Sequence, residues 1–211
     1  MTRLITRMSF LIPVLLSASF LLAQTEFSAE VYNNQKNDNP QAKIYFGKDK
    51  IRFEASKKDP RGGGALIMNL ATQTSTVIMD QQRMYMELPA QMASQRNAYH
   101  FFRTGDADNA CADWMAQSWN KGGTCHKVGI ETVNGRSCVR YDGTNARGET
   151  GSVWLDPKLR FPVKWLGKNG ESGELRNIQE GSQPSSLFDI PADYKKFDMA
   201  NMGAMMQQQN Q

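Results

Sequence analysis

The chain contains 211 residues, of which 40% are hydrophobic and 22% are charged, and its formal net charge is +4 at pH 7. This length suits one domain with a substantial hydrophobic core. The charge falls to +2 without Arg3 and Arg7, and basic residues are interleaved with acidic ones, so nucleic acid is not expected as a partner.

The N-terminus has the pattern of a secretory signal peptide over residues 1–23. Two arginines precede an apolar run over residues 10–22, and Ala23 is a small residue at which cleavage can occur. An uncleaved membrane anchor is the alternative, although the run is shorter than a membrane span needs. No later apolar run has the length of a span. We therefore expect a periplasmic or secreted protein, either soluble or in peripheral contact with a membrane.

Alternating apolar and polar residues predict a series of strands in the first half of the chain. Ile44 and Phe46, for example, alternate with Lys43 and Tyr45, which is the period of a sheet with one buried face. The connections between these strands are short, so antiparallel pairing is expected. The predicted strands cover residues 27–32, 43–46, 51–55, 65–70, 76–79 and 83–88.

The pattern changes over residues 89–120, where two inserted helices are predicted. Pro89 is suited to the first turn of a helix, and Asn109 can cap the second helix with its side chain. Both helices have apolar residues at helical spacing. The first stripe contains Met92, Tyr99 and Phe102, and the second contains Cys111, Trp114, Met115, Ser118 and Trp119.

The sheet resumes at Lys127 with a hairpin around Asn134-Gly135, the strongest short hairpin signal in the chain. This register places Cys138 opposite Glu131. One face of the hairpin is then formed by Val128, Ile130, Thr132, Ser137, Val139 and Tyr141.

Further strands are predicted on both sides of Asp156-Pro157, which breaks an apolar run, and over residues 172–182. Phe188 and Ile190 are expected to anchor a terminal strand, and residues 200–211, rich in methionine and glutamine, are expected to be disordered. A sheet of this many strands curls, and the two helices are the only cover available for its concave face. The predicted fold class is mainly β, or α+β.

The three cysteines predict one disulfide and one free thiol, as expected of an exported protein. Of the three pairings, Cys111–Cys125 is favoured because these residues bracket a helix and a Gly-Gly turn, whereas Cys138 lies within a strand. The cysteines and His126 are also candidate zinc ligands, but their spacing is irregular and the oxidising compartment favours a disulfide. We expect no metal and no cofactor.

The sequence contains none of the motifs of common enzyme active sites. G-x-S-x-G, H-E-x-x-H and a phosphate-binding glycine loop are missing, and the chain has only two histidines. An enzyme is therefore not expected.

Three segments resemble a known superfamily: VNGRSCVRYDG at 133–143, VWLDPKLRFPVKW at 153–165 and LFDIPADYKKF at 187–197. Together with the strand order and the two-helix insert, they resemble the LolA-like (lipoprotein localisation factor) superfamily, and most closely an exported bacterial family of unknown function. The resemblance implies an unclosed antiparallel half-barrel over residues 24–199, with helices plugging its mouth. The best-known member of the superfamily carries lipoproteins across the periplasm with their acyl chains in the cavity.

These observations predict a non-catalytic binding or carrier protein for a lipid or a lipoprotein acyl chain, with envelope proteins as further candidate partners. Methionine is flexible and suits an apolar binding surface, although ordinary core filling explains it equally well. The alternative function is a structural or interaction module of the cell envelope with a packed core and no ligand. The candidate cavity residues are Ile44, Phe46, Ile51, Phe53, Met68, Met84, Met86, Trp114 and Met115.

Overall fold

The fold was determined from a computed structural model, which describes residues 24–33, 39–56, 63–88, 102, 105–116 and 121–197. The predicted signal peptide and C-terminal tail lie outside these residues. So does most of the first predicted helix, of which only Phe102, in helical conformation, is described.

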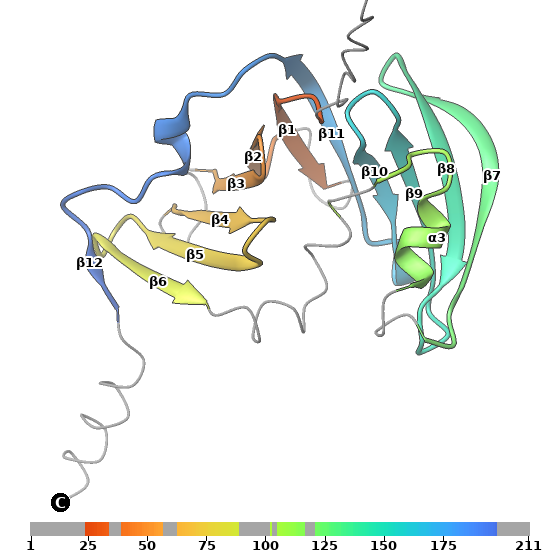
Figure 1. The fold of residues 1–211 in the computed structure, drawn as a ribbon, viewed down its shortest axis with the longest axis horizontal. Coiled ribbons are helices and arrows are strands. Elements are labelled where there is room, and N and C mark those ends of the chain that lie inside the picture. The colour runs from red at the N-terminus through yellow and green to blue at the C-terminus, as the bar shows by residue number, and fades with distance from the viewer. Residues whose placement is uncertain are drawn as a thin grey trace, which may run out of the picture.

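Twelve strands form one unclosed sheet in the order β12-β6-β5-β4-β3-β2-β1-β11-β10-β9-β8-β7 (Figure 1). The predicted antiparallel pairing is confirmed throughout, except that β12 lies parallel to β6. The strands are β1 Phe27–Asn33, β2 Ala42–Gly47, β3 Lys50–Ala55, β4 Ala65–Asn69, β5 Thr74–Met79, β6 Met84–Leu88, β7 Thr124–Val133, β8 Arg136–Thr144, β9 Thr150–Asp156, β10 Phe161–Leu166, β11 Ser172–Glu180 and β12 Lys195–Lys196.

The first strand joins the two halves of the sheet. Strand β1 pairs with β2 on one side and with β11 on the other, so that Phe27 lies between Phe46 and Glu180. Between Ser28 and Glu30 of β1 the register shifts, because two residues of β11, Asn177 and Ile178, lie opposite Ala29 alone, and this bulge in β11 accompanies the curl of the sheet.

An aromatic cluster fills the concave face where the two halves meet. The ring centroids of Phe27, Phe46 and Phe161 lie 5.1–5.8 Å apart, and all three side chains are fully buried. Aromatic pairs at this distance contribute about 0.5–1.5 kcal/mol beyond their burial. The three rings belong to one cluster of buried hydrophobic residues that draws on both halves of the sheet.

The C-terminal segment covers the opposite face of β2 to β6. Phe188 is buried against Ile67 and Ile78, and the Arg52 guanidinium donates a hydrogen bond of 3.2 Å to the Leu187 carbonyl. The expected terminal strand at Phe188 is therefore wrong. Phe188 belongs to the 3-10 helix η3, Ser185–Phe188, because Pro184 directs the chain across the sheet; only Lys195–Lys196 pairs as a strand.

The hairpin between β7 and β8 turns at Asn134-Gly135, as predicted. Both residues have positive φ, 48° and 78°, which a type I′ turn requires and which asparagine and glycine tolerate. The predicted pairing of Glu131 with Cys138 is confirmed.

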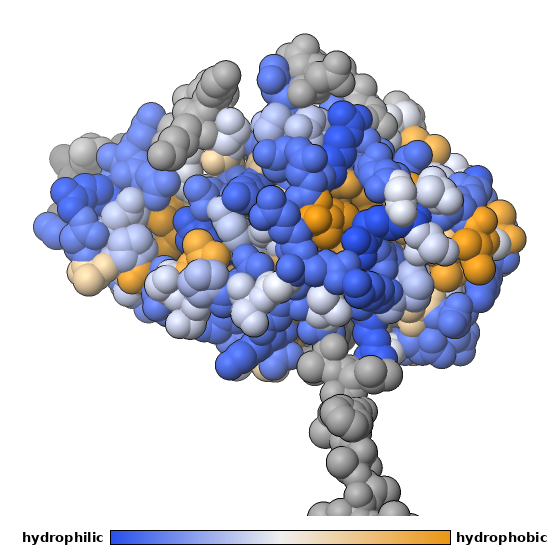
Figure 2. Space-filling model, turned by 90° about the horizontal axis from the view of Figure 1, so that it is seen from above, coloured by the Kyte–Doolittle hydropathy of each residue, from blue (hydrophilic) through white to orange (hydrophobic). Residues whose placement is uncertain are grey.

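The prediction that Val128 shares one face of this hairpin with Val139 and Tyr141 is wrong. A bulge between Lys127 and Gly129 makes Val128 an extra residue, so it does not share the face of Val139. Ile130 does pair with Val139, yet it is 72% exposed because β7 is the edge strand and has no cover there. Figure 2 shows an apolar patch at this end of a mainly hydrophilic surface.

One inserted helix is described, α3, Ala110–Met115, with the 3-10 helix η2, Lys168–Gly170, elsewhere in the chain. Ser118 and Trp119 lie outside the described residues. Asn109 precedes α3 as predicted, but its side chain makes no capping hydrogen bond. The Ala110 amide instead donates to the Tyr141 hydroxyl, at 3.4 Å. No helix within the described ranges is long and apolar enough to cross a membrane.

We predict that ionisation of Cys138 makes stability depend on pH above the neutral range. Burial raises the pKa of this thiol to about 11, above that of an unfolded cysteine. The unfolded state therefore loses the proton first, and the stabilisation that is present below about pH 9 is lost as the pH rises towards 11.

Urea unfolding of the wild type and of Cys138→Ala at about pH 8 and about pH 10.5 tests this expectation. Comparison with the variant removes the contribution of lysines and tyrosines. The free energy of unfolding of the wild type should fall more than that of the variant. An equal fall in both proteins would contradict a buried, neutral thiol.

Candidate ligand-binding cavity

The concave face contains an apolar cavity of about 400 Å³, which lies within the size range of small-molecule sites, about 300–1,000 Å³. We call it the apolar cavity. None of the described residues that line it is charged. They are Val31, Ile44, Phe53, Phe102, Gly151, Ser152, Val153, Phe161, Trp165, Leu166, Gly167 and Leu175.

Phe102 of the inserted segment closes one side of the apolar cavity. Its ring stacks on Phe161 with the centroids 5.1 Å apart, and the Phe53 centroid lies 5.6 Å away at a tilt of 50°. These rings come from three distant parts of the sequence. Phe102 therefore lies over the concave face, while the rest of the first predicted helix lies outside the described residues.

Trp165 forms part of the wall and depends on a glycine opposite it. Trp165 and Gly173 are cross-strand partners on β10 and β11. A Cβ atom at Gly173 would come within 2.3–3.0 Å of the indole. Glycine thus allows the ring to lie flat over β11 and keeps it out of the cavity.

The structure divides the candidate residues from the sequence into four groups. Ile44 and Phe53 line the apolar cavity. Phe46, Ile51 and Met68 are buried in the adjoining core. Met84 and Met86 lie on β6, where the register places them on the same face as Leu66, beyond this lining. Trp114 and Met115 line a second, neighbouring hollow.

The large wall residues that the sequence analysis did not name include four that come together at the centre of the sheet: Val31, Phe161, Trp165 and Leu175. All four occupy apolar positions of predicted strands, so the signal for burial was present. Their convergence depends on the pairing of β1 with β11, in which Val31 lies opposite Leu175. No local pattern indicates which strands from opposite ends of a chain will pair.

The second hollow, of about 350 Å³, lies between α3 and the ends of β7 to β10, and we call it the rim pocket. It shares Gly151, Val153 and Gly167 with the apolar cavity. Trp114, Met115, Tyr141 and Val153 provide its apolar surface. Its polar and charged lining consists of Thr124, Asp142, Thr144, Asn145, Glu149, Thr150, Lys168 and Glu171.

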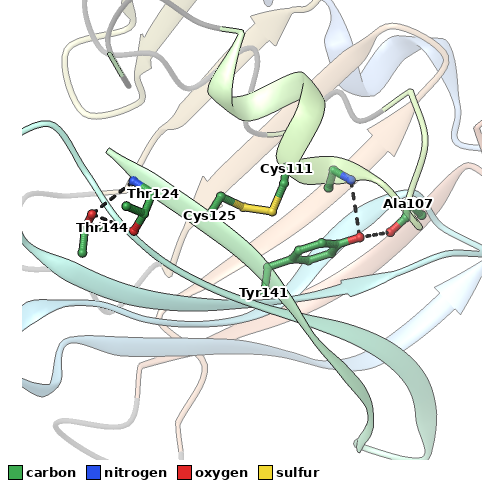
Figure 3. The surroundings of a disulfide bond; sticks show 7 residues. Ala107, Cys111, Thr124, Cys125, Tyr141 and Thr144 are labelled. Atoms are coloured by element: carbon green, nitrogen blue, oxygen red, sulfur yellow. Dashed lines mark hydrogen bonds between the residues drawn. A yellow bond between two sulfur atoms is a disulfide. The ribbon is translucent and has the colours of Figure 1, made fainter. Parts of the chain in front are cut away.

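Two interactions hold α3 over the rim pocket (Figure 3). The predicted disulfide is present and joins Cys111 of α3 to Cys125 of β7, with their Cα atoms 5.5 Å apart, while Cys138 is free and buried. The Tyr141 hydroxyl donates a hydrogen bond of 2.7 Å to the Ala107 carbonyl. Burial raises the pKa of Tyr141, so this hydroxyl keeps its proton at neutral pH.

The best candidate for polar chemistry is a row of His126, Asp142 and Ser152 on the other face of the sheet, around a hollow of about 290 Å³. Arg140 makes two hydrogen bonds to the Asp142 carboxylate, at 2.8 and 2.9 Å, and holds its pKa below the usual range. Ser152 also hydrogen-bonds to this carboxylate rather than to an imidazole base. The row therefore lacks the order of a nucleophile, a base and an orienting carboxylate.

The described residues contain no group of three or more histidine, cysteine, aspartate or glutamate side chains placed to hold a metal ion. The two bonded cysteines are 14 residues apart and form the disulfide, so they are not available as zinc ligands.

We predict that Cys125→Ser loosens α3 more than the sheet. The disulfide closes a short loop and contributes roughly 3 kcal/mol in the chain-entropy model. Hydrogen exchange should accelerate in residues 105–116 and remain slow in β1 and β11. Tyr141→Phe, which removes the second attachment but leaves the disulfide, is the matched comparison. A global loss of protection in Cys125→Ser would mean that the disulfide stabilises the whole core.

We further predict that Gly173→Ala obstructs the apolar cavity. The added methyl group displaces the indole of Trp165 from β11, and the cavity is the space next to it. The fluorescence emission of Trp165 should change, with Trp165→Phe in the same background identifying its contribution. Unchanged emission together with unchanged stability would contradict this packing.

The sequence profile of a family described as "Domain of unknown function (DUF4412)" matches residues 30–160. No curated protein sequence matches this chain.

Among solved structures, the chain is similar to an uncharacterised conserved protein from Thermus thermophilus, with 10% identity and a TM-score of 0.52 over 83% of this chain and 91% of that one. It is also similar to PNGF-II (10% identity, TM-score 0.48), with coverage of 87% of this chain and 33% of that chain. The lipoprotein LppX of Mycobacterium tuberculosis has 13% identity and a TM-score of 0.39, with coverage of 76% and 88%.

The Thermus structure supports the fold alone, since so low an identity carries no function. The profile covers more than half of the chain, and the unclosed curved sheet with an inserted cover is the architecture that the resemblance implied. The chain belongs to this DUF4412 family of unknown function.

Proposed function

We propose that this protein is an exported, non-catalytic binding or carrier protein that holds an apolar ligand between the concave face of the sheet and its helical cover. The ligand is a lipid or the acyl chain of a lipoprotein. The observation that carries this proposal is the apolar cavity, which remains open beside a tightly packed aromatic core.

Such a cavity is costly unless something fills it. Protein interiors are close-packed, and apolar surface that stays in contact with water forgoes about 25 cal/mol per Å² of hydrophobic stabilisation. The aromatic rings of Phe27, Phe46 and Phe161 demonstrate that this chain packs tightly elsewhere on the same face. An apolar ligand would offset the cost of the open space.

The chemistry of the walls favours hydrocarbon over a polar ligand. The walls contain aromatic and aliphatic side chains, and among the described lining residues Ser152 alone has a hydroxyl group. A polar ligand in this space would lose its hydrogen bonds to water without replacement. A flexible acyl chain has no such groups to satisfy.

Two observations support export to the periplasm or beyond. Residues 1–23 have the pattern of a signal peptide. The disulfide between Cys111 and Cys125 is of a kind that forms and persists in oxidising compartments and is rare in the cytosol.

A structural or interaction module of the envelope is the second candidate. The exposed fractions of Val128 and Ile130, 48% and 72%, favour a contact with another envelope protein along the edge strand β7. Both functions can coexist, since this edge lies outside the lining of the apolar cavity.

The proposal predicts that an uncharged fluorescent probe, N-phenyl-1-naphthylamine, binds to the delipidated protein and that Val31→Phe weakens its binding about tenfold or more. The larger side chain occupies part of the apolar cavity, from which it displaces the probe. The matched control is Val128→Phe, the same change at an exposed site on β7. Equal weakening by both variants would place the bound probe elsewhere.

Mass spectrometry of organic extracts provides an independent measurement. Wild-type protein purified after export should contain bound lipid, and the Val31→Phe variant should contain less of it. If the wild-type protein contains no lipid and binds no probe, the binding function is refuted, and the structural or interaction module is the function that stands.

A further inference from the structure

We propose that the ligand is a single-chain amphiphile with an uncharged, hydrogen-bonding headgroup, which lies in the rim pocket while the acyl chain occupies the apolar cavity. This inference rests on the proposed function and specifies the ligand class. It follows from how the two hollows meet and from the charges around the outer one.

The two hollows meet at Gly151, Val153 and Gly167. Two of these residues have no side chain, so Val153 alone places a side chain at the boundary. The two hollows are therefore contiguous, with one side chain between them. One linear molecule can therefore lie across both hollows.

Polarity increases sharply from one hollow to the other. The described lining of the apolar cavity has no charged side chain, whereas the carboxylates of Glu149 and Glu171 and the ammonium group of Lys168 border the rim pocket. The rim pocket retains apolar contacts through Trp114 and Met115. This gradient matches a molecule with a hydrocarbon end and a polar end.

The charges of the rim pocket disfavour an anionic headgroup. The Asp142 carboxylate lies on the other face of the sheet, where Arg140 neutralises it through two hydrogen bonds. Lys168 supplies the ammonium group in the described lining, and its Nζ atom lies 3.3 Å from the Glu149 carboxylate. Glu171 adds a further negative charge.

Glu149 is held in its ionised form. Its carboxylate accepts a hydrogen bond of 2.9 Å from the Asn145 amide, and this bond, followed by that from Lys168, holds its pKa below the usual range. A fatty-acid carboxylate or a phosphate would therefore meet like charges around an ammonium group that already has a partner.

Hydroxyl groups, by contrast, find suitable partners. The Asn145 side-chain amide and the Lys168 ammonium group, which both line the rim pocket, can donate a hydrogen bond to a hydroxyl oxygen. The Glu171 carboxylate can accept from a hydroxyl without a charge penalty. A glycerol-like headgroup carries hydroxyls that can donate to the carboxylate and accept from the donors.

Competition between amphiphiles that share one acyl chain tests the inference. Delipidated full-length protein is loaded with N-phenyl-1-naphthylamine, and 1-monolauroylglycerol or laurate is added below its micelle concentration at about pH 8 and low salt, where charge effects are least screened. We expect 1-monolauroylglycerol to displace the probe at a concentration about tenfold lower than laurate does.

Charge removal provides the second measurement. In the double variant Glu149→Gln, Glu171→Gln, laurate should gain about tenfold in affinity, while 1-monolauroylglycerol and the probe remain within about twofold of the wild type. The matched control is Glu87→Gln, on β6 and outside both hollows, which should change none of the three.

The outcomes are distinguishable. Tighter binding of laurate than of 1-monolauroylglycerol overturns the inference but leaves an apolar binding site, and so does a double variant without effect on laurate. A protein that binds neither lipid nor probe overturns the proposed function, and the inference with it.

Discussion

The pairing of β1 with β11 is the constraint on which the rest of the structure depends. It places Phe27 opposite Glu180 and Val31 opposite Leu175, and so converts two runs of local hairpins into one curved sheet. The entropy of bringing such distant segments together is recovered only when the apolar concave face of the joined sheet is buried. The aromatic cluster of the concave face lies at this seam.

Additional polar contacts reinforce the seam from the second half of the chain. The Asn134 side-chain amide donates a hydrogen bond of 3.0 Å to the Leu175 carbonyl, which draws the β7–β8 turn onto β11. Arg136 forms ion pairs with Asp156 and Glu180, and so connects β8, β9 and β11. The curvature that shapes the concave face is therefore maintained by side chains as well as by the sheet itself.

Filling of the concave face is uneven, and this unevenness creates the candidate site. Rings from β1, β2 and β10 pack against one another on the concave face, and Phe102 stacks on this group of rings. The helix α3 covers a different part of the face, over β7 and β8. The disulfide and Tyr141 fix α3 to β7 and β8 rather than to the centre of the sheet. The two hollows lie against these covers, the apolar cavity at Phe102 and the rim pocket at Trp114.

Local patterns in the sequence determined the strands, the hairpin at Asn134-Gly135 with its Glu131–Cys138 register, the disulfide and the mainly antiparallel sheet, because each depends on neighbouring residues or short connections. They also assigned Ile44 and Phe53 to the concave face. They did not separate these residues from Phe46 and Ile51, which have the same alternation but lie in the packed core.

Only the tertiary structure decided which apolar residues line the cavity and which lie in the packed core, because the outcome depends on what covers each side chain. Phe161 reaches Phe46 only because β10 follows β11 and β11 pairs with β1. The bulge that exposes Val128 and the course of Phe188 across the outer face likewise depend on the completed sheet. Alternation in a sequence specifies which side of a strand is apolar, but it carries no information about which distant segment will cover that side, and this is what separates a packed core from a cavity.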